Sequence, residues 1–270
     1  MSDQPPILDI NPPLINSSNP WATTLDDLRA LFECASTGAV TTRTSLIKGF
    51  DHDPTKHQYT FFGVTDHVTS QTAMASSNAS LNTLGYSPIL LNEYLGFIKQ
   101  IYDGNAVPAT PNPSKGFIVS VTGTPEEVAD CYRLIAISQT GVAFPLAMEV
   151  NLSCPNIPSK PPPAYSKDSL VEYIDALSVS IQAMPNLPRV PFGLKTPPYT
   201  HSTEFEALIG ALEQSARRGI SPVSFLTATN TLGSCMAFSS PTEPSGPALP
   251  GLGIGGMAGA PLRMYTFTTS

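Results

Sequence analysis

Short, nearly continuous apolar runs alternate along the chain with stretches in which apolar residues recur at helical spacing. Apolar runs of this length that are rich in β-branched residues are typical of strands buried on both faces. Regular alternation of strand and helix favours a parallel sheet with right-handed crossovers. We therefore expect an α/β fold with strands at residues 13–18, 38–44, 116–123, 146–153, 191–196 and 222–229.

The stretches between these strands carry the start and stop signals of helices. Thr124 can cap a helix, Pro125 suits its first turn, and Glu127 completes a capping box. A second Thr-x-x-Glu box begins at Thr203, and Gly219 is a helix stop. These signals, with the apolar stripes between them, predict helices at residues 24–36, 124–139, 166–184 and 203–219.

A closed barrel and a doubly wound sheet both fit this alternation. No Gly-x-Gly-x-x-Gly follows the first strand, which argues against a dinucleotide-binding sheet. Polar residues recur where the predicted strands end, and barrel enzymes keep their sites at the carboxyl ends of their strands. We therefore predict a (β/α)8 barrel, with candidate site residues at Ser17 and Ser18, Arg43 and Thr44, Asn151 and Cys154, Lys195, and Asn230 and Thr231.

Three segments show neither the apolar period of a strand nor that of a helix and are expected to be irregular: residues 66–88, 103–115 and 236–255. The 28 prolines of the chain also imply many shaped loops, and such loops often carry sites. Because no independent apolar core lies on either side of them, we interpret the three segments as insertions at a site or lids. Residues 1–270 are then a single domain.

Composition narrows the class of protein. With 41% hydrophobic and 13% charged residues, the chain of 270 residues can bury one substantial core. A formal charge of −7 and the lack of any Lys/Arg cluster argue against nucleic-acid and anionic-membrane partners. The start, "MSDQPPILD", has no signal-peptide pattern, and no apolar stretch approaches about 18 residues, so we expect a soluble cytoplasmic protein.

The four cysteines are dispersed and the four histidines lack metal-ligand spacing, so no disulfide framework and no metal site are predicted. Cys131 falls on the apolar face of a helix and is assigned to core packing. Cys154, beside amides and prolines, could act as a nucleophile or as a base, and in either role it must be a thiolate. No histidine lies near it in sequence to form a Cys-His pair, which makes nucleophilic hydrolysis the weaker alternative.

Several motifs resemble those of one family over nearly the whole chain and in the same order. They are "SLNTLGYSP" at 80–88, "EVNLSCPNIPSKP" at 149–161, "GLKTPPY" at 193–199, "TATNTLG" at 227–233 and "GIGGMAGAPL" at 253–262. Together they resemble dihydroorotate dehydrogenases of the soluble, fumarate-using class. Dihydropyrimidine dehydrogenase has a flavin domain with a similar cysteine element, but the Lys-x-Pro-Pro-Tyr run and the "SKPPPAY" loop favour the orotate enzyme.

The resemblance implies an FMN-containing (β/α)8 barrel that oxidises (S)-dihydroorotate to orotate in de novo pyrimidine biosynthesis and is reoxidised by fumarate. It also implies a homodimer. Cys154 matches the family's base, which removes the C5 proton while the C6 hydride goes to flavin N5. Lys195 matches the lysine at the flavin N1/O2 edge, where a cation stabilises developing negative charge.

Other roles carry over position by position from the same resemblance. The residues matching substrate contacts are Arg43, Asn82, Leu84, Gly85, Tyr86, Asn151, Asn156, Asn230 and Thr231. Those matching cofactor contacts are Ser17, Ser18, Arg43, Thr44, Asn151, Lys195, Thr231, Gly255 and Gly256.

Arg43 departs from the family, whose members carry a lysine at this position. The positive charge is kept, but a planar guanidinium group replaces the compact ammonium group of lysine. Arg43 could pair bidentately with the orotate carboxylate, or it could alter the substrate preference. The second alternative leaves open a flavin dehydrogenase acting on another pyrimidine or on an enoyl substrate.

The resemblance also ends early, near Pro261 and Leu262, eight residues before the chain stops. Six barrel strands are accounted for. The seventh and eighth strands, and the glycine-rich phosphate-binding loops that follow them, have no counterpart in this sequence. We therefore expect this chain to bind FMN poorly or not at all. A non-catalytic remnant that keeps a binding surface, or that pairs with a complete subunit, is a further alternative.

Overall fold

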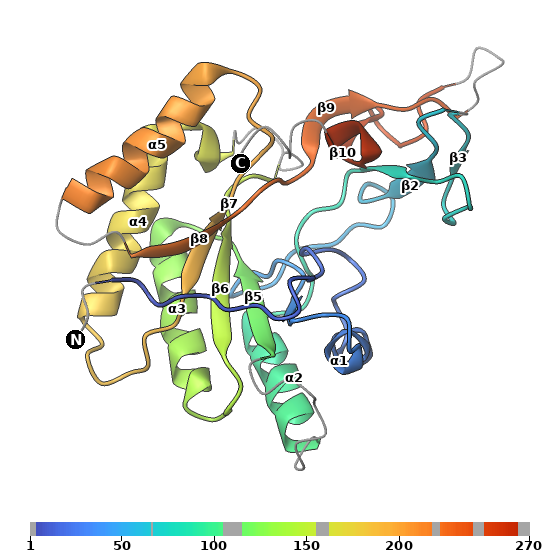
Figure 1. Ribbon diagram of the computed structural model, residues 1–270. Coiled ribbons are helices and arrows are strands. Elements are labelled where there is room, and N and C mark those ends of the chain that lie inside the picture. The colour runs from blue at the N-terminus through green and yellow to red at the C-terminus, as the bar shows by residue number, and fades with distance from the viewer. Residues whose placement is uncertain are drawn as a thin grey trace.

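The computed structural model describes residues 4–65, 67–104, 115–154, 162–217, 222–239 and 246–263. These residues form a parallel sheet backed by helices and a second, antiparallel sheet beside it (Figure 1). No helix among them is both long enough and apolar enough to cross a membrane.

The parallel sheet follows chain order. Its strands are β1 (Ala39–Thr41), β5 (Gly116–Val121), β6 (Leu146–Asn151), β7 (Phe192–Lys195) and β8 (Val223–Thr227), in the order β1-β5-β6-β7-β8. Ile15 adds a parallel bridge to Ala39 on the outer side of β1, so the predicted strand at 13–18 is reduced to one bridge. Sequential parallel pairing is the arrangement of barrel strands, and the predicted barrel-type fold is confirmed. In the described residues the arc stays open, because no pairing joins β8 to the Ile15 segment.

The crossover helices lie close to where the periodicity predicts them. The helices are α1 (Leu25–Glu33), α2 (Leu91–Gly104), α3 (Pro125–Gln139), α4 (Lys167–Gln182) and α5 (Ser202–Arg217), with 3-10 turns at Pro163–Tyr165 and Ala260–Leu262. The capping box at the start of α3 is confirmed, since Thr124 and Glu127 exchange both hydrogen bonds. Helix α2 is not predicted by the sequence pattern.

The predicted Thr-x-x-Glu box at Thr203 is wrong. Helix α5 begins one residue earlier, at Ser202, and Glu204 accepts the backbone N–H groups of Thr200 and His201 at 2.7 and 3.2 Å. A carboxylate at the positive end of a helix satisfies these otherwise unpaired donors. The predicted stop at Gly219 lies outside the described residues.

Each central strand buries both faces, and the two faces have different neighbours. Phe117, Val119, Met148 and Phe192 belong to the large core that the strands share with the helices. The alternate positions Ala39, Ile118 and Ala147 point the other way and pack against Leu8, Ile10, Ile15 and Phe225. The N-terminal segment therefore lies on the face that the helices leave open (Figure 1).

The second sheet corrects the expectation that residues 66–88 and 236–255 are irregular. Its strands are β2 (Tyr59–Phe62), β3 (Thr69–Ser70), β4 (Ala79–Asn82), β9 (Leu232–Met236) and β10 (Ile254–Gly259), in the order β3-β2-β4-β10-β9. Strand β4 pairs with β10, although the two strands are separated in sequence by more than half of the chain, and Asn82 lies opposite Gly256. Strands β2 and β4 each bury alternate residues, but over only four residues. The pairing that joins them into a sheet comes from distant segments. Of residues 103–115, the last two of α2 are helical and 105–114 lie outside the described residues.

The interface between α3 and the sheet gives a test of the core. We expect Ile135→Ala to lower the free energy of unfolding by about 2–5 kcal/mol, because Ile135 is fully buried and its truncation leaves a cavity. Ile137→Ala on the same helix is the matched control, since Ile137 is 45% exposed. Urea unfolding checks both variants, and equal losses would contradict the assignment of the two faces.

Candidate active site

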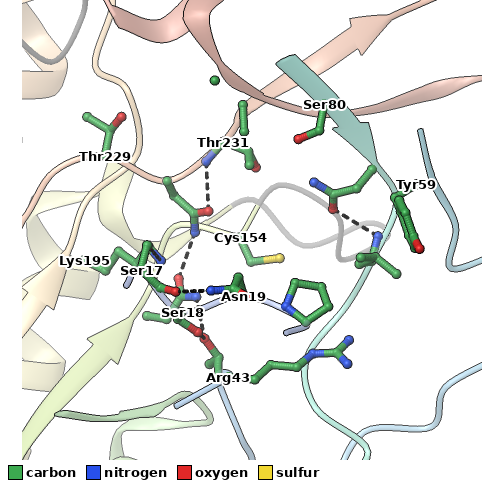
Figure 2. Close-up of a pocket in the computed structure, with 18 of the residues that line it drawn as sticks. Ser17, Ser18, Asn19, Arg43, Tyr59, Ser80, Cys154, Lys195, Thr229 and Thr231 are labelled. Carbon is green, nitrogen blue, oxygen red and sulfur yellow. Dashed lines mark hydrogen bonds between the residues drawn. The ribbon is translucent and has the colours of Figure 1, made fainter. Parts of the chain in front are cut away.

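A cavity of about 590 Å³ lies where the carboxyl ends of the parallel strands meet the antiparallel sheet. The parallel arc contributes Ser17, Arg43, Asn151 and Lys195, and the second sheet contributes Tyr59, Ser80 and Asn82. Figure 2 shows Lys195, Ser17 and Ser18 on one side of Cys154, and Tyr59 and Ser80 on the other. The cavity therefore exists only because two sheets built from distant segments face each other.

Most of the residues singled out by sequence line this one cavity. They are Ser17, Ser18, Arg43, Thr44, Asn82, Leu84, Gly85, Tyr86, Asn151, Cys154, Lys195, Asn230 and Thr231. Asn156 lies outside the described residues.

Gly255 and Gly256 are not among the residues that line this cavity, and their contact with a cofactor stays a prediction. Both lie in β10, and a Cβ on Gly255 would stand 2.4 Å from the carbonyl oxygen of Asn82. The Gly256 carbonyl accepts a hydrogen bond from Asn82 Nδ2 at 3.2 Å. The backbone of the diglycine therefore approaches β4 closely and fixes Asn82.

A buried ion pair lies at the inner end of the cavity. Lys195 Nζ is 3.9 Å from Glu149 Oε1, and each side chain is 3% exposed. Ser120 donates to Glu149 at 2.8 Å, and Lys195 donates to Ser17 Oγ at 3.2 Å. Buried charges are tolerated when they are paired and hydrogen-bonded, and these contacts meet that requirement. They also hold the lysine against the cavity.

A chain of hydrogen-bonded amide and hydroxyl groups extends from the ion pair. Thr44 Oγ1 lies 2.9 Å from Ser120 Oγ and accepts Asn151 Nδ2 at 2.9 Å. Asn230 Nδ2 donates to Asn151 Oδ1 at 3.0 Å, and the Thr231 N–H donates to Asn230 Oδ1 at 2.8 Å. Each amide is thus oriented by the next, so the cavity wall is preorganised for a ligand that both donates and accepts hydrogen bonds.

Arg43 brings positive charge to the other end of this wall. Its Nη2 atom donates to the Gly85 carbonyl at a long 3.4 Å, and burial lowers the pKa of the guanidinium. Among the ion pairs of the described residues, none involves Arg43. A half-buried cation without a carboxylate partner is a ready contact for an anionic ligand group.

Cys154 comes three residues after β6 and lines the cavity together with Tyr86. Burial raises the pKa of Tyr86 well above its usual range, and the neighbouring Cys154 adds to the effect. The phenol therefore stays protonated and is available as a hydrogen-bond donor.

The sequence reasoning missed two groups of residues. Glu149 and Ser120 form the first group and lie within strands. A charged residue inside the apolar run 146–151 is a signal that could have identified Glu149, because Glu149 and Asn151 are two residues apart and share one face of the strand. The other group reaches the cavity through the loop after Ser18, the antiparallel sheet and their neighbours, and no local signal identifies it. It comprises Asn19, Pro20, Trp21, Tyr59, Ser80, Thr229, Ala258, Gly259, Ala260, Leu262 and Arg263.

Comparison with known proteins places this geometry in context. No family model matches the chain. The chain is 26% identical over 249 residues to dihydroorotate dehydrogenase (fumarate) of Trypanosoma cruzi, covering 92% of this chain and 67% of the relative. It is 23% identical over 254 residues to dihydroorotate dehydrogenase A (fumarate) of Lactococcus lactis subsp. cremoris, covering 93% and 68%.

A solved structure shares the fold. Ligand-free dihydroorotate dehydrogenase of Eimeria tenella superposes with a TM-score of 0.59 at 15% identity, covering 94% of this chain and 66% of that one. The chain thus spans about two thirds of the length of its relatives. The resemblance inferred from the motifs is confirmed: over nearly its whole length, the chain is similar to dihydroorotate dehydrogenases of the fumarate class, and by that resemblance it is an enzyme.

Proposed function

We propose that the chain carries an FMN-dependent site that oxidises (S)-dihydroorotate to orotate, with fumarate as the final acceptor, in de novo pyrimidine biosynthesis. One observation carries the proposal: Cys154 faces the same cavity as Asn82, Asn151 and Asn230. A base and a set of amides around one space are what the oxidation of a flat, polar ring requires.

The substrate end of the cavity is assigned to Arg43 and the turn at Gly85. Dihydroorotate carries a carboxylate, and Arg43 is the half-buried cation that has no ion pair with another described residue. Asn82, held through its Nδ2 atom to Gly256 and through its Oδ1 atom to the Leu84 N–H, has its orientation fixed. The amides then present directed donors and acceptors to the ring.

The residues around Lys195 fit the edge of a flavin ring. Lys195 would hold the N1/O2 edge as a buried cation, and Ser17, Ser18 and Thr44 offer small side chains with hydroxyls beside it. When bound, FMN supplies the acceptor for the hydride that leaves C6 of the substrate. Glu149 and Ser17 keep Lys195 in place, and its third N–H remains for the ligand.

In this proposal Cys154 is the base. Its thiolate takes the C5 proton of dihydroorotate, and the lone pair becomes a thiol S–H bond as the ring double bond forms. Arg43 and Lys195 line the same cavity and favour the anionic form of the sulfur. The proposal also includes one functional domain, because both sheets border this cavity. A homodimer is included as the resemblance implies, and the cytoplasmic location stays a prediction.

The first prediction separates this function from its alternatives. FMN is added in excess to the purified chain. Under anaerobic conditions dihydroorotate should then bleach the visible flavin absorbance, and fumarate should restore it. Bleaching by dihydrouracil in place of dihydroorotate would favour the other pyrimidine substrate. A chain that never binds FMN would favour the non-catalytic alternative.

The second prediction concerns the base. Cys154→Ala should lower the rate of flavin reduction by dihydroorotate by about 10²- to 10⁴-fold, the usual contribution of a positioned base. Stopped-flow absorbance measures the rate. Cys34→Ala is the matched control, because Cys34 is exposed at the end of α1. Loss of the rate in the control, or its survival in Cys154→Ala, would contradict the assignment.

The third prediction concerns the carboxylate. Arg43→Gln should raise the dissociation constant for orotate by about 10- to 100-fold, because one charge-assisted hydrogen bond is lost. Calorimetry measures the binding of orotate. Quenching of the Trp21 fluorescence shows that orotate binds in the cavity, because Trp21 is the single tryptophan of the chain and lines the cavity. Arg29→Gln is the control, because the Arg29 side chain is 43% exposed on α1 and does not line the cavity. Equal affinities for the Arg43 and Arg29 variants would rule out the contact.

A further inference from the structure

The loop from Phe50 to Gln58 supports the turn that carries Gly85. On one side of this turn, the Phe50 N–H donates to the Ser87 carbonyl at 3.0 Å. On the other side, the Gln58 N–H donates to Thr83 Oγ1 at 3.0 Å, and the Thr83 N–H donates to the Gln58 carbonyl at 2.9 Å. Both ends of the loop are therefore bonded to the turn, so the shape of the loop determines where the turn lies.

The ring of Phe50 also lies directly against the turn. A Cβ on Gly85 would stand 2.2 Å from a carbon of this ring, and Tyr86 packs edge-on against it with 5.8 Å between ring centroids. Gly85 and Tyr86 line the cavity, and the Gly85 carbonyl accepts the hydrogen bond from Arg43. A movement of Phe50 is therefore transmitted to the end of the cavity assigned to the substrate carboxylate.

His57 holds this loop closed. Its Nδ1 atom accepts the Asp53 N–H at 2.9 Å, and its own backbone N–H donates to the Asp53 carbonyl at 2.8 Å. The centroid of the His57 ring lies 5.1 Å from that of the uncharged Phe50 ring, on the side of the turn. An imidazole nitrogen accepts a hydrogen bond only when it carries no proton, so the closed loop requires a neutral His57.

The titratable groups that act on His57 all come from the same loop: Asp51, His52, Asp53 and Lys56. Burial is the main cause that lowers the pKa of His57, and His52, with its ring centroid 5.3 Å away, lowers the pKa further. The Asp53 carboxylate opposes this effect, but it is already paired with Lys56 Nζ at 2.9 Å and accepts the Thr55 N–H at 2.9 Å. This carboxylate is therefore satisfied while His57 is neutral.

We propose that His57 is a pH switch for ligand binding: a proton taken from solvent at Nδ1 breaks the bond from the Asp53 N–H, opens the loop and releases the Gly85 turn. The inference rests on the proposed function, in which this turn and Arg43 hold the carboxylate end of the substrate. Two N–H donors cannot share a hydrogen bond, so the imidazolium must leave its place. Phe50 then loses its support, and the turn loses its position at the cavity.

The sign of the pH dependence follows from this contact. Because the closed loop disfavours the imidazolium, His57 takes up a proton more readily when the loop is open or the chain is unfolded. The contribution of the closed loop is therefore complete above the ordinary histidine pKa of about 6.5 and is lost as the pH falls below that value. Ligand affinity should fall over the same range of pH.

Hydrogen exchange in the full chain tests the switch without any ligand. The Phe50 and Thr83 N–H groups join the loop to the turn, and mass spectrometry follows the peptides that contain them. His57→Asn keeps an amide oxygen as acceptor but does not titrate. At about pH 5 these peptides should exchange about ten-fold faster in the parent chain than in His57→Asn, whereas at about pH 7.5 the two should agree.

Calorimetry with orotate, in the presence of excess FMN, then tests the coupling to the cavity. Between about pH 7.5 and about pH 5 the dissociation constant of the parent chain should rise about five- to ten-fold more than that of His57→Asn. His67→Asn is the matched control, because His67 is exposed, does not line the cavity and has a φ of 54°, which asparagine tolerates. This control should follow the parent chain.

A second variant carries the test if His57→Asn does not fold. His52→Asn removes a neighbouring group that disfavours the imidazolium of His57, so the loss of exchange protection should begin at a higher pH than in the parent chain. An onset that is unchanged or lower would contradict the switch.

The inference is overturned if the parent chain and His57→Asn exchange equally at about pH 5, or if their affinities for orotate depend on pH in the same way. Exchange that depends on His57 in a chain that binds orotate at no pH would uphold the release of the turn while removing the proposed function. The two failures are therefore distinguishable.

Discussion

The ammonium group of Lys195 and the carboxylate of Glu149 lie 3.9 Å apart with almost no exposure to water, on adjacent parallel strands. An unpaired charge at either position would be costly in such an interior, so the two side chains constrain each other. Ser120, Thr44 and Asn151 then extend the contact by hydrogen bonds across the inner face of the arc. Changing one member leaves its neighbours buried without a partner, so this wall has one low-energy arrangement.

Strand alternation is what makes that wall possible. In β6, Met148 and Val150 face the helices, while Glu149 and Asn151 face inward; in β7, Leu194 faces the helices and Lys195 faces inward. The same strands therefore supply the apolar core and the polar site, on opposite faces. A shift of one residue in register would exchange the two faces and bury the charges among the helices.

The antiparallel sheet closes the space that the arc opens. Asn82 joins the two halves of this antiparallel sheet, because its backbone pairs with β2 on one side and with β10 on the other. Its side chain accepts a hydrogen bond from the Leu84 N–H and donates one to the Gly256 carbonyl. Trp21 packs against Tyr59 with ring centroids 5.5 Å apart, which ties the segment before α1 to this sheet. The site thus combines a rigid polar wall with an aromatic and amide wall from a different part of the chain.

The sequence by itself determined the elements whose signals are local. Periodicity identified the parallel strands and four of the helices, because a buried strand and an amphipathic helix each leave their own period in the chain. The motif around Cys154, with Lys195 and Asn230, identified one wall of the site, because barrel strands place their carboxyl ends together. Only the tertiary structure decided the rest. The pairing of β4 with β10, the packing of Gly255 against Asn82 and the Glu149 partner of Lys195 all join segments far apart in sequence. Such contacts depend on distances between folded elements, and no local pattern of residues encodes them.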